Sequence, residues 1–171
     1  MRSNNPRTRA QQLLERMNLR SLPVPVDKIA KALGAQLCFS PLDEELSGMI
    51  FIKENVPIIG VNSLHHPNRQ RFTIAHEIGH LELHRELIAN KIHVDKKFSV
   101  LMRDANSATG TARIEIEANK FAAELLMPQS ILHRALEMEP FDIDDDAPIA
   151  NLAKRFRVSR QALEYQIVNL S

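Results

Sequence analysis

One helical pattern, running from about Pro67 to Leu87, constrains this chain more than any other part of its sequence. It contains the sequence RFTIAHEIGHLELH, in which His76 and His80 are four residues apart. Such residues lie about one turn apart on one face of a helix, so both imidazoles can reach a single metal ion. Glu77 is rotated by about 100° from His76, which allows its carboxylate to act as a base on water beside that ion. A plain histidine pair on a helix surface is the alternative interpretation.

A catalytic zinc ion usually takes three protein ligands, so a third donor is needed. His84 is too distant, because on a continuous helix it lies about 12 Å along the axis from His76. A second helical pattern, RIEIEANKFAAELLMP, offers Glu115 and Glu117. Glu117 is in phase with the apolar stripe that includes Phe121, whereas Glu115 is rotated away from Glu117 by about 200°. We therefore predict Glu117 as the third ligand and Glu115 as a solvated charge or an outer partner of the site.

Two single residues refine this prediction. Gly79 lies inside the histidine helix, where glycine costs about 1 kcal/mol relative to alanine. We therefore expect another backbone, such as that of the second helix, to pack closely against it. Asn119 is either a helix-surface amide or a group that orients a ligand by a hydrogen bond.

The two motifs together resemble those of the ImmA/IrrE-type metallopeptidases. That family has an R-F-T-x-A-H-E-x-G-H helix and a later E-A-N-x-F-A-x-x-L-L-M-P helix, and this chain also shares the upstream segments PVDKIAKALGA, LSGMIF and IIGVNS. The similarity covers residues 8 to 130. It implies a compact α+β fold with a gluzincin-like site, in which the glutamate before Ala118 and Asn119 is the third zinc ligand.

The remaining patterns predict the elements around this site. A helix is expected from Pro6 to about Met17, and a second over KIAKAL, between Asp27 and Gly34. AQLCF, GMIFI and PIIGVN are suited to strands, with residues 53–57 as the turn between the last two. The predicted fold class is α+β: a small antiparallel sheet of about three strands packed on a helical, gluzincin-like metallopeptidase core, with a C-terminal helix-turn-helix-like segment.

The segment from Glu137 to Asp146 contains six acidic residues, and this is the sharpest change in composition along the chain. We interpret the chain as a metallopeptidase domain (1–136), an acidic linker (137–147) and a helix-turn-helix-like helical segment (148–171). In that last segment, PIANLAKRFRVSRQALEYQIVNL predicts two short helices. Its basic residues would allow DNA contact through 152–167, but a helical hairpin that caps the core is the favoured interpretation.

Composition argues against several other classes of protein. The formal net charge is +1 with well mixed charges, which is typical neither of a nucleic-acid binder nor of a membrane-surface protein. No apolar run approaches the roughly 20 residues of a membrane helix, and the polar start is unlike a signal peptide, so we expect a cytoplasmic protein without a membrane partner. The five glycines form no phosphate-binding loop. The single cysteine, Cys38, is expected in a buried strand.

These observations predict a zinc-dependent endopeptidase in which His76, His80 and Glu117 hold Zn²⁺ and Glu77 is the general base. Donors for a second oxyanion contact stay open between His93 and Arg103. The family's described role is to cleave or inactivate a helix-turn-helix repressor, which implies such a repressor as partner and substrate, in phage, mobile-element or stress regulation. The alternative is a non-catalytic or toxin-like regulator that binds a repressor or DNA and carries a structural metal.

Overall fold

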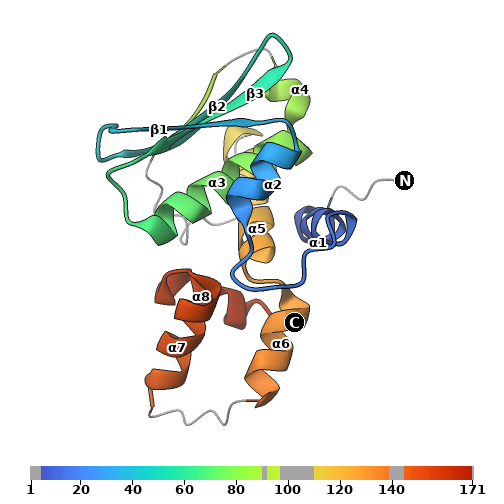
Figure 1. Ribbon diagram of the computed structural model, residues 1–171, viewed down its shortest axis with the longest axis vertical. Coiled ribbons are helices and arrows are strands. Elements are labelled where there is room, and N and C mark those ends of the chain that lie inside the picture. Colours follow the sequence, from blue (N-terminus) through green and yellow to red (C-terminus); the bar gives the residue numbers. More distant parts are fainter. Residues whose placement is uncertain (1–4, 90–91, 97–109, 139–144, 171) are drawn as a thin grey trace.

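The computed structural model describes residues 5–89, 92–96, 110–138 and 145–170. They form an α+β fold, as predicted, with a sheet at one end and helices beneath it (Figure 1). The strands are β1 (Gln36–Ser40), β2 (Leu46–Lys53), β3 (Val56–Asn62) and β4 (His93–Lys96). The helices are α1 (Pro6–Arg16), α2 (Val26–Ala32), α3 (Pro67–Leu83), α4 (Arg85–Ile88), α5 (Gly110–Leu126), α6 (Gln129–Met138), α7 (Ala147–Phe156) and α8 (Arg160–Val168).

The sheet differs in detail from the predicted three antiparallel strands. Its order is β1-β3-β2-β4, and β1 pairs with β3 in parallel. β2 and β3 form a hairpin through Glu54 and Asn55, whose positive φ angles of 51° and 64° suit a tight two-residue turn. β1 and β3 run in the same direction because the chain reverses twice between them, once before β2 and once before β3. β4 comes from a segment without hydrophobic periodicity, which is why the sequence did not predict it.

Cys38 lies in β1 as expected, but its predicted burial is wrong. β1 is at the end of the strand order, and four of its five residues are exposed, with Phe39 at 52%. An edge strand is covered less completely than a central one, so a short apolar run is not enough to predict burial there.

The core joins α3 to the sheet above and to α5 beside it. α3 packs against β2 and β3, and α1 packs on α5. The predicted apolar stripe of α5 is confirmed, since Ala118, Phe121, Ala122, Leu125 and Leu126 are all fully buried. The close approach expected at Gly79 is also confirmed: a Cβ there would lie 3.1 Å from the backbone oxygen of Ala118. The two helices that carry the candidate site are therefore in backbone contact.

The C-terminal helices α7 and α8 confirm the predicted pair. They are separated by Arg157, in the left-handed region at φ 54°, and by Ser159, whose Oγ accepts from the backbone N–H of Ala162. α8 is attached to α5 through the buried Gln166, which donates to Glu124 and to the carbonyl of Met127. The segment is thus fastened to the helical core by polar contacts, as a capping hairpin would be. Residues 139–144 of the predicted linker lie outside the described residues, so the domain boundaries stay a prediction.

Candidate metal centre

α3 carries three chemically important side chains into the interior of the protein. The helix begins at Pro67, after His66, whose Nδ1 accepts from the backbone N–H of Asn68, and it ends at Leu83. His76 and His80 lie in its second half at 1% and 0% exposure. Their Nε2 atoms are 3.0 Å apart, as expected for histidines one turn apart that aim at a common point.

The third member of this group is Glu115, in the first half of α5. Its Oε2 lies 3.2 Å from Nε2 of His76, and its Oε1 lies 3.2 Å from Nε2 of His80. Ligand atoms of a tetrahedral zinc ion, each about 2.0–2.2 Å from the metal, lie about 3.3–3.5 Å from one another. The observed separations match that arrangement to within a few tenths of an ångström. Among the residues that the structure describes, these three form the one cluster of His, Cys, Asp or Glu that could hold a metal ion.

The choice of Glu117 as the third ligand does not fit this geometry and has to be corrected. Oε2 of Glu117 lies 2.8 Å from Nε2 of His84, and its Oε1 accepts from Nε of Arg113 at 2.9 Å. Glu117 therefore lies on the outer side of the cluster. Although its partial burial raises the pKa, the hydrogen bonds from His84 and Arg113 bring the pKa of Glu117 below its ordinary value.

The histidine ring nitrogens that face away from Glu115 also have partners. Nδ1 of His76 lies 2.8 Å from Oδ1 of Asn119, which favours the orienting role over that of a helix-surface amide, the two alternatives left open by the sequence. Nδ1 of His80 lies 3.2 Å from Nδ1 of His84, which is the residue directly after α3 and is 8% exposed. His84 is outside the three-residue cluster, as predicted, but it contacts one member of that cluster.

Glu77, the predicted general base, is fully buried between α3 and the sheet. It lies close to β2: a Cβ built on Gly48 would be 3.5 Å from Oε1 of Glu77 and 2.5 Å from Cγ2 of Thr73. Any side chain at position 48 would therefore crowd β2 against α3. Gly48 thus permits the close approach of β2 to α3 at Thr73, beside Glu77, and the sequence analysis did not identify this role.

The candidates for a second oxyanion contact stay undecided. His93 lies in β4, which pairs with β2, and nothing is described of its side chain. Arg103 lies outside the described residues. Tyr165, the only tyrosine of the chain, lies in α8 and is 39% exposed. α8 carries no member of the cluster of His76, His80 and Glu115.

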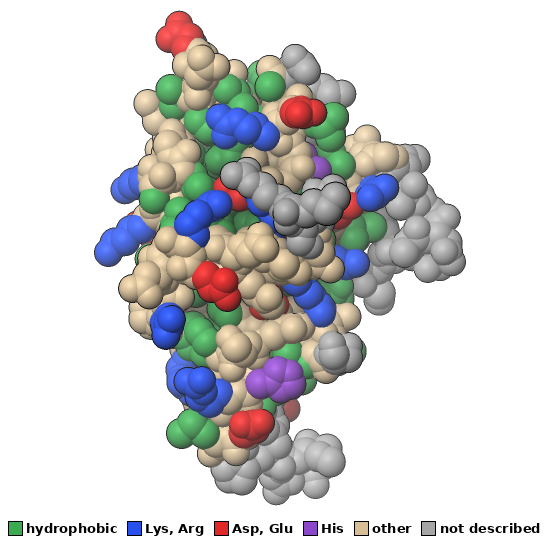
Figure 2. All heavy atoms as spheres, turned by 90° about the vertical axis from the view of Figure 1, so that its right-hand side faces the viewer, with side chains coloured by type: hydrophobic (Ala, Val, Ile, Leu, Met, Phe, Trp, Pro, Cys, Tyr) green, Lys and Arg blue, Asp and Glu red, His purple; other side chains and the backbone are tan. Residues whose placement is uncertain are grey.

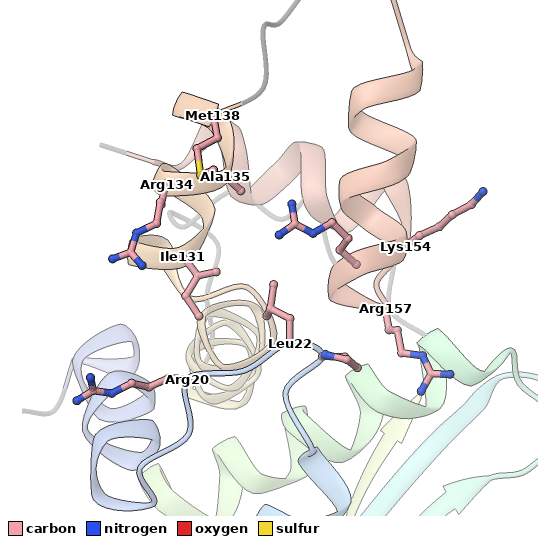
Figure 3. A pocket seen from close by; sticks show the side chains of 10 residues that line it. Arg20, Leu22, Ile131, Arg134, Ala135, Met138, Lys154 and Arg157 are labelled. Carbon is pink, nitrogen blue, oxygen red and sulfur yellow. The ribbon is translucent and has the colours of Figure 1, made fainter.

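A separate hollow of about 980 Å³ lies between α6, α7 and the segment before α2 (Figure 3). Leu22, Ile131 and Met138 give it an apolar part, and basic residues surround them. The basic residues are Arg20, Arg134, Lys154, Arg155 and Arg157. Arg160, in α8, forms ion pairs with Asp146 and Glu164. Contact with DNA through residues 152–167 stays a prediction.

One face of the molecule shows no dominance of one charge. On the face in Figure 2, basic, acidic and hydrophobic side chains are interspersed, in line with the mixed composition. None of the helices within the described ranges combines the length and the apolar character needed to cross a membrane.

Comparison with known proteins identifies the family of this chain. A curated relative, the radiation response metalloprotease IrrE of Deinococcus radiodurans, is 36% identical over 138 residues, which are 78% of this chain and 37% of the relative. The chain thus spans well under half of that relative's length. A solved Mycobacterium tuberculosis transcriptional regulator has a TM-score of 0.60 at 19% identity, over 92% of this chain and 45% of that one, and therefore shares its fold. The family model of the IrrE N-terminal-like domain, Peptidase_M78, matches residues 30–168, and the chain belongs to that family.

Proposed function

We propose that this protein is a zinc-dependent endopeptidase with His76, His80 and Glu115 as the metal ligands. The observation that carries the proposal is the buried group of two Nε2 atoms and one carboxylate, all within 4.8 Å of one another. Two imidazoles and a carboxylate are a common ligand set of catalytic zinc, and three protein ligands leave a coordination position for water or substrate. Membership of a metallopeptidase family supports the same conclusion.

The chemistry divides between the metal and Glu77. Bound zinc supplies Lewis-acid polarisation of a peptide carbonyl and increases the acidity of water. Glu77 follows His76 on α3 and is rotated by about 100° from it, so its carboxylate is beside the cluster and outside the ligand set. We assign it the proton transfers: it takes a proton from the attacking water and passes it to the departing amine nitrogen. Its full burial favours this role, because a carboxylate in a dry site is a stronger base than one in water.

For the substrate, we propose a transcriptional repressor of the helix-turn-helix class. The resemblance to ImmA/IrrE-type proteins implies this substrate, and the name of the Deinococcus relative, a radiation response metalloprotease, fits a regulatory target. Cleavage of such a repressor would relieve repression of the genes that it controls. An enzyme of this kind is expected to cut its own target and to leave generic peptides almost untouched.

Metal content tests the site. We expect about one zinc ion per chain in the wild type and its loss in His76→Ala and Glu115→Gln. Glu137→Gln, at an exposed position of α6, is the matched control and should keep the metal. A wild type that stays without metal after zinc is supplied would refute the proposal.

Activity is tested with purified helix-turn-helix repressors, beginning with any that is encoded beside this gene. The wild type should cut one of them, and Glu77→Gln should bind zinc normally but cut at least about 100-fold more slowly, since general-base catalysis contributes about 10²–10⁴-fold. A Glu77→Gln variant as fast as the wild type would remove Glu77 from the mechanism. Binding of the repressor without cleavage by the zinc-loaded wild type would favour the non-catalytic regulator.

A further inference from the structure

The proposed ligand His80 is the first member of a chain of polar contacts that leads away from the cluster. Its Nδ1 faces Nδ1 of His84 at 3.2 Å, and Nε2 of His84 faces Glu117 at 2.8 Å. Arg113 completes the chain by donating to the other oxygen of Glu117 at 2.9 Å. The exposure of these side chains rises outward, from 0% at His80 to 7% at His84, 26% at Glu117 and 77% at Arg113.

The proton positions in this chain follow from its outer end. An ionised carboxylate can only accept hydrogen bonds, so Nε2 of His84 must carry the proton and donate to Glu117. In a neutral imidazole the other nitrogen is then an acceptor, so Nδ1 of His84 accepts and Nδ1 of His80 donates. The proton of His80 is thereby held on Nδ1. Its Nε2 then carries a lone pair on the side of Glu115 and His76, which is the form that binds a metal.

We infer that His84 and Glu117 are positioning residues that hold His80 in the tautomer and ring orientation that bind zinc. The inference rests on the proposed function and deepens it. His76 is held in the same tautomer by a single contact, because Oδ1 of Asn119 accepts from its Nδ1. Nδ1 of His76 is thus contacted by an amide, whereas Nδ1 of His80 is contacted by a histidine that in turn contacts a carboxylate.

The position of His84 in the chain makes this arrangement possible. On an uninterrupted helix, residue 84 would continue the row of His76 and His80 along the surface. Instead α3 ends at Leu83, and His84 has φ −128° and ψ 28° before α4 begins. With this break, the centroid of the His84 ring lies 5.3 Å from the centroid of the His80 ring. Nε2 of His84 then faces Glu117 of α5.

The experiment measures zinc affinity by competition with a chromophoric chelator, together with the melting temperature of the metal-free protein. We expect His84→Leu and Glu117→Leu each to weaken zinc binding by about 10- to 100-fold, the usual effect of removing an outer partner of a metal ligand. His84→Gln and Glu117→Gln should retain more of the affinity, because each amide oxygen can replace the lost acceptor. His133→Leu, at an exposed position of α6, is the control and should bind zinc as the wild type does.

A double variant separates positioning from simple structural support. If the two residues act through one chain of contacts, His84→Leu/Glu117→Leu should bind zinc no more weakly than His84→Leu alone. Three results would each overturn the inference. They are losses of affinity that multiply in the double variant, an unchanged affinity in His84→Leu, and a lower melting temperature without a change in affinity. The proposed function is judged separately: if His76→Ala and Glu115→Gln lose zinc while His84→Leu does not, the metal site stands and only the positioning role fails.

Discussion

Replacing Gly79 by alanine tests whether the close contact between α3 and α5 shapes the metal centre. A Cβ at this position would lie 3.1 Å from the backbone oxygen and 3.2 Å from the Cα of Ala118, and 3.1 Å from Cδ1 of Phe121. Carbon atoms prefer non-bonded separations of about 3.5–4.0 Å, so the contact is short by roughly 0.4 Å. Two of the three neighbours are backbone atoms of α5, which cannot rotate away. The helices therefore have to separate.

Two opposing contributions determine the size of the effect. Alanine in a helix interior is about 1 kcal/mol more favourable than glycine, which would stabilise Gly79→Ala. Overpacking of a close contact costs about 1–3 kcal/mol, and the rigid backbone of Ala118 argues for the middle of that range. We expect a net loss of about 1 kcal/mol in the free energy of unfolding. Because Glu115 lies one turn before Ala118, the same displacement moves its carboxylate away from the histidines and should lower zinc affinity several-fold.

Urea denaturation of the metal-free protein measures the first quantity, and chelator competition measures the second. Gly110→Ala is the matched control, since nothing lies within 4 Å of a Cβ at Gly110, and its effect should stay within about 0.5 kcal/mol. The reasoning is refuted if Gly79→Ala is stabilised by about 1 kcal/mol and binds zinc as tightly as the wild type. That result would mean that the helix spacing adapts without cost.

Two further predictions concern the contact of β2 with α3 and the buried Glu124 between α5 and α8. Gly48→Ala should lower the free energy of unfolding by about 3 kcal/mol in urea titrations, because its Cβ would lie 2.5 Å from Cγ2 of Thr73 and 2.6 Å from the backbone oxygen of Gly60. Gly60→Ala meets the flexible side chain of Met49 at 3.0 Å and should lose less than half as much; equal losses would contradict the argument. Burial raises the pKa of Glu124 above its ordinary value of 4.5, so the native protein holds a proton that the unfolded chain releases. The resulting stabilisation is present at acid pH and is lost as the pH rises through the native pKa. The wild type should therefore lose stability relative to Glu124→Gln as the pH rises from 4.5, and parallel curves would refute this.

Much of the fold could be predicted from the sequence because its local signals agree with its tertiary contacts. The helix expected from Pro6 to about Met17 is α1, and Gly34, at φ 83°, follows α2 as predicted. Non-local features were harder to predict. Nothing local in β1 indicates that its partner is β3 or that the pairing is parallel, and the periodicity of residues 85–88 does not show that the helix breaks at His84. Such features depend on which segments meet in space.

The error at Glu117 has a more specific physical cause. Helical phase was measured against the bulky apolar residues of α5, and that stripe faces the core as a whole. The part of α5 closest to Gly79 of α3 is the backbone of Ala118, together with the ring of Phe121. Glu115 lies three residues before Ala118, about one turn away on the same side of α5, and its carboxylate reaches both histidines. Glu117 is the residue directly before Ala118 and is rotated from it by about 100°, so its side chain reaches His84 instead. Which residue of α5 meets Gly79 is a tertiary contact, and the phase of the apolar stripe alone does not determine it.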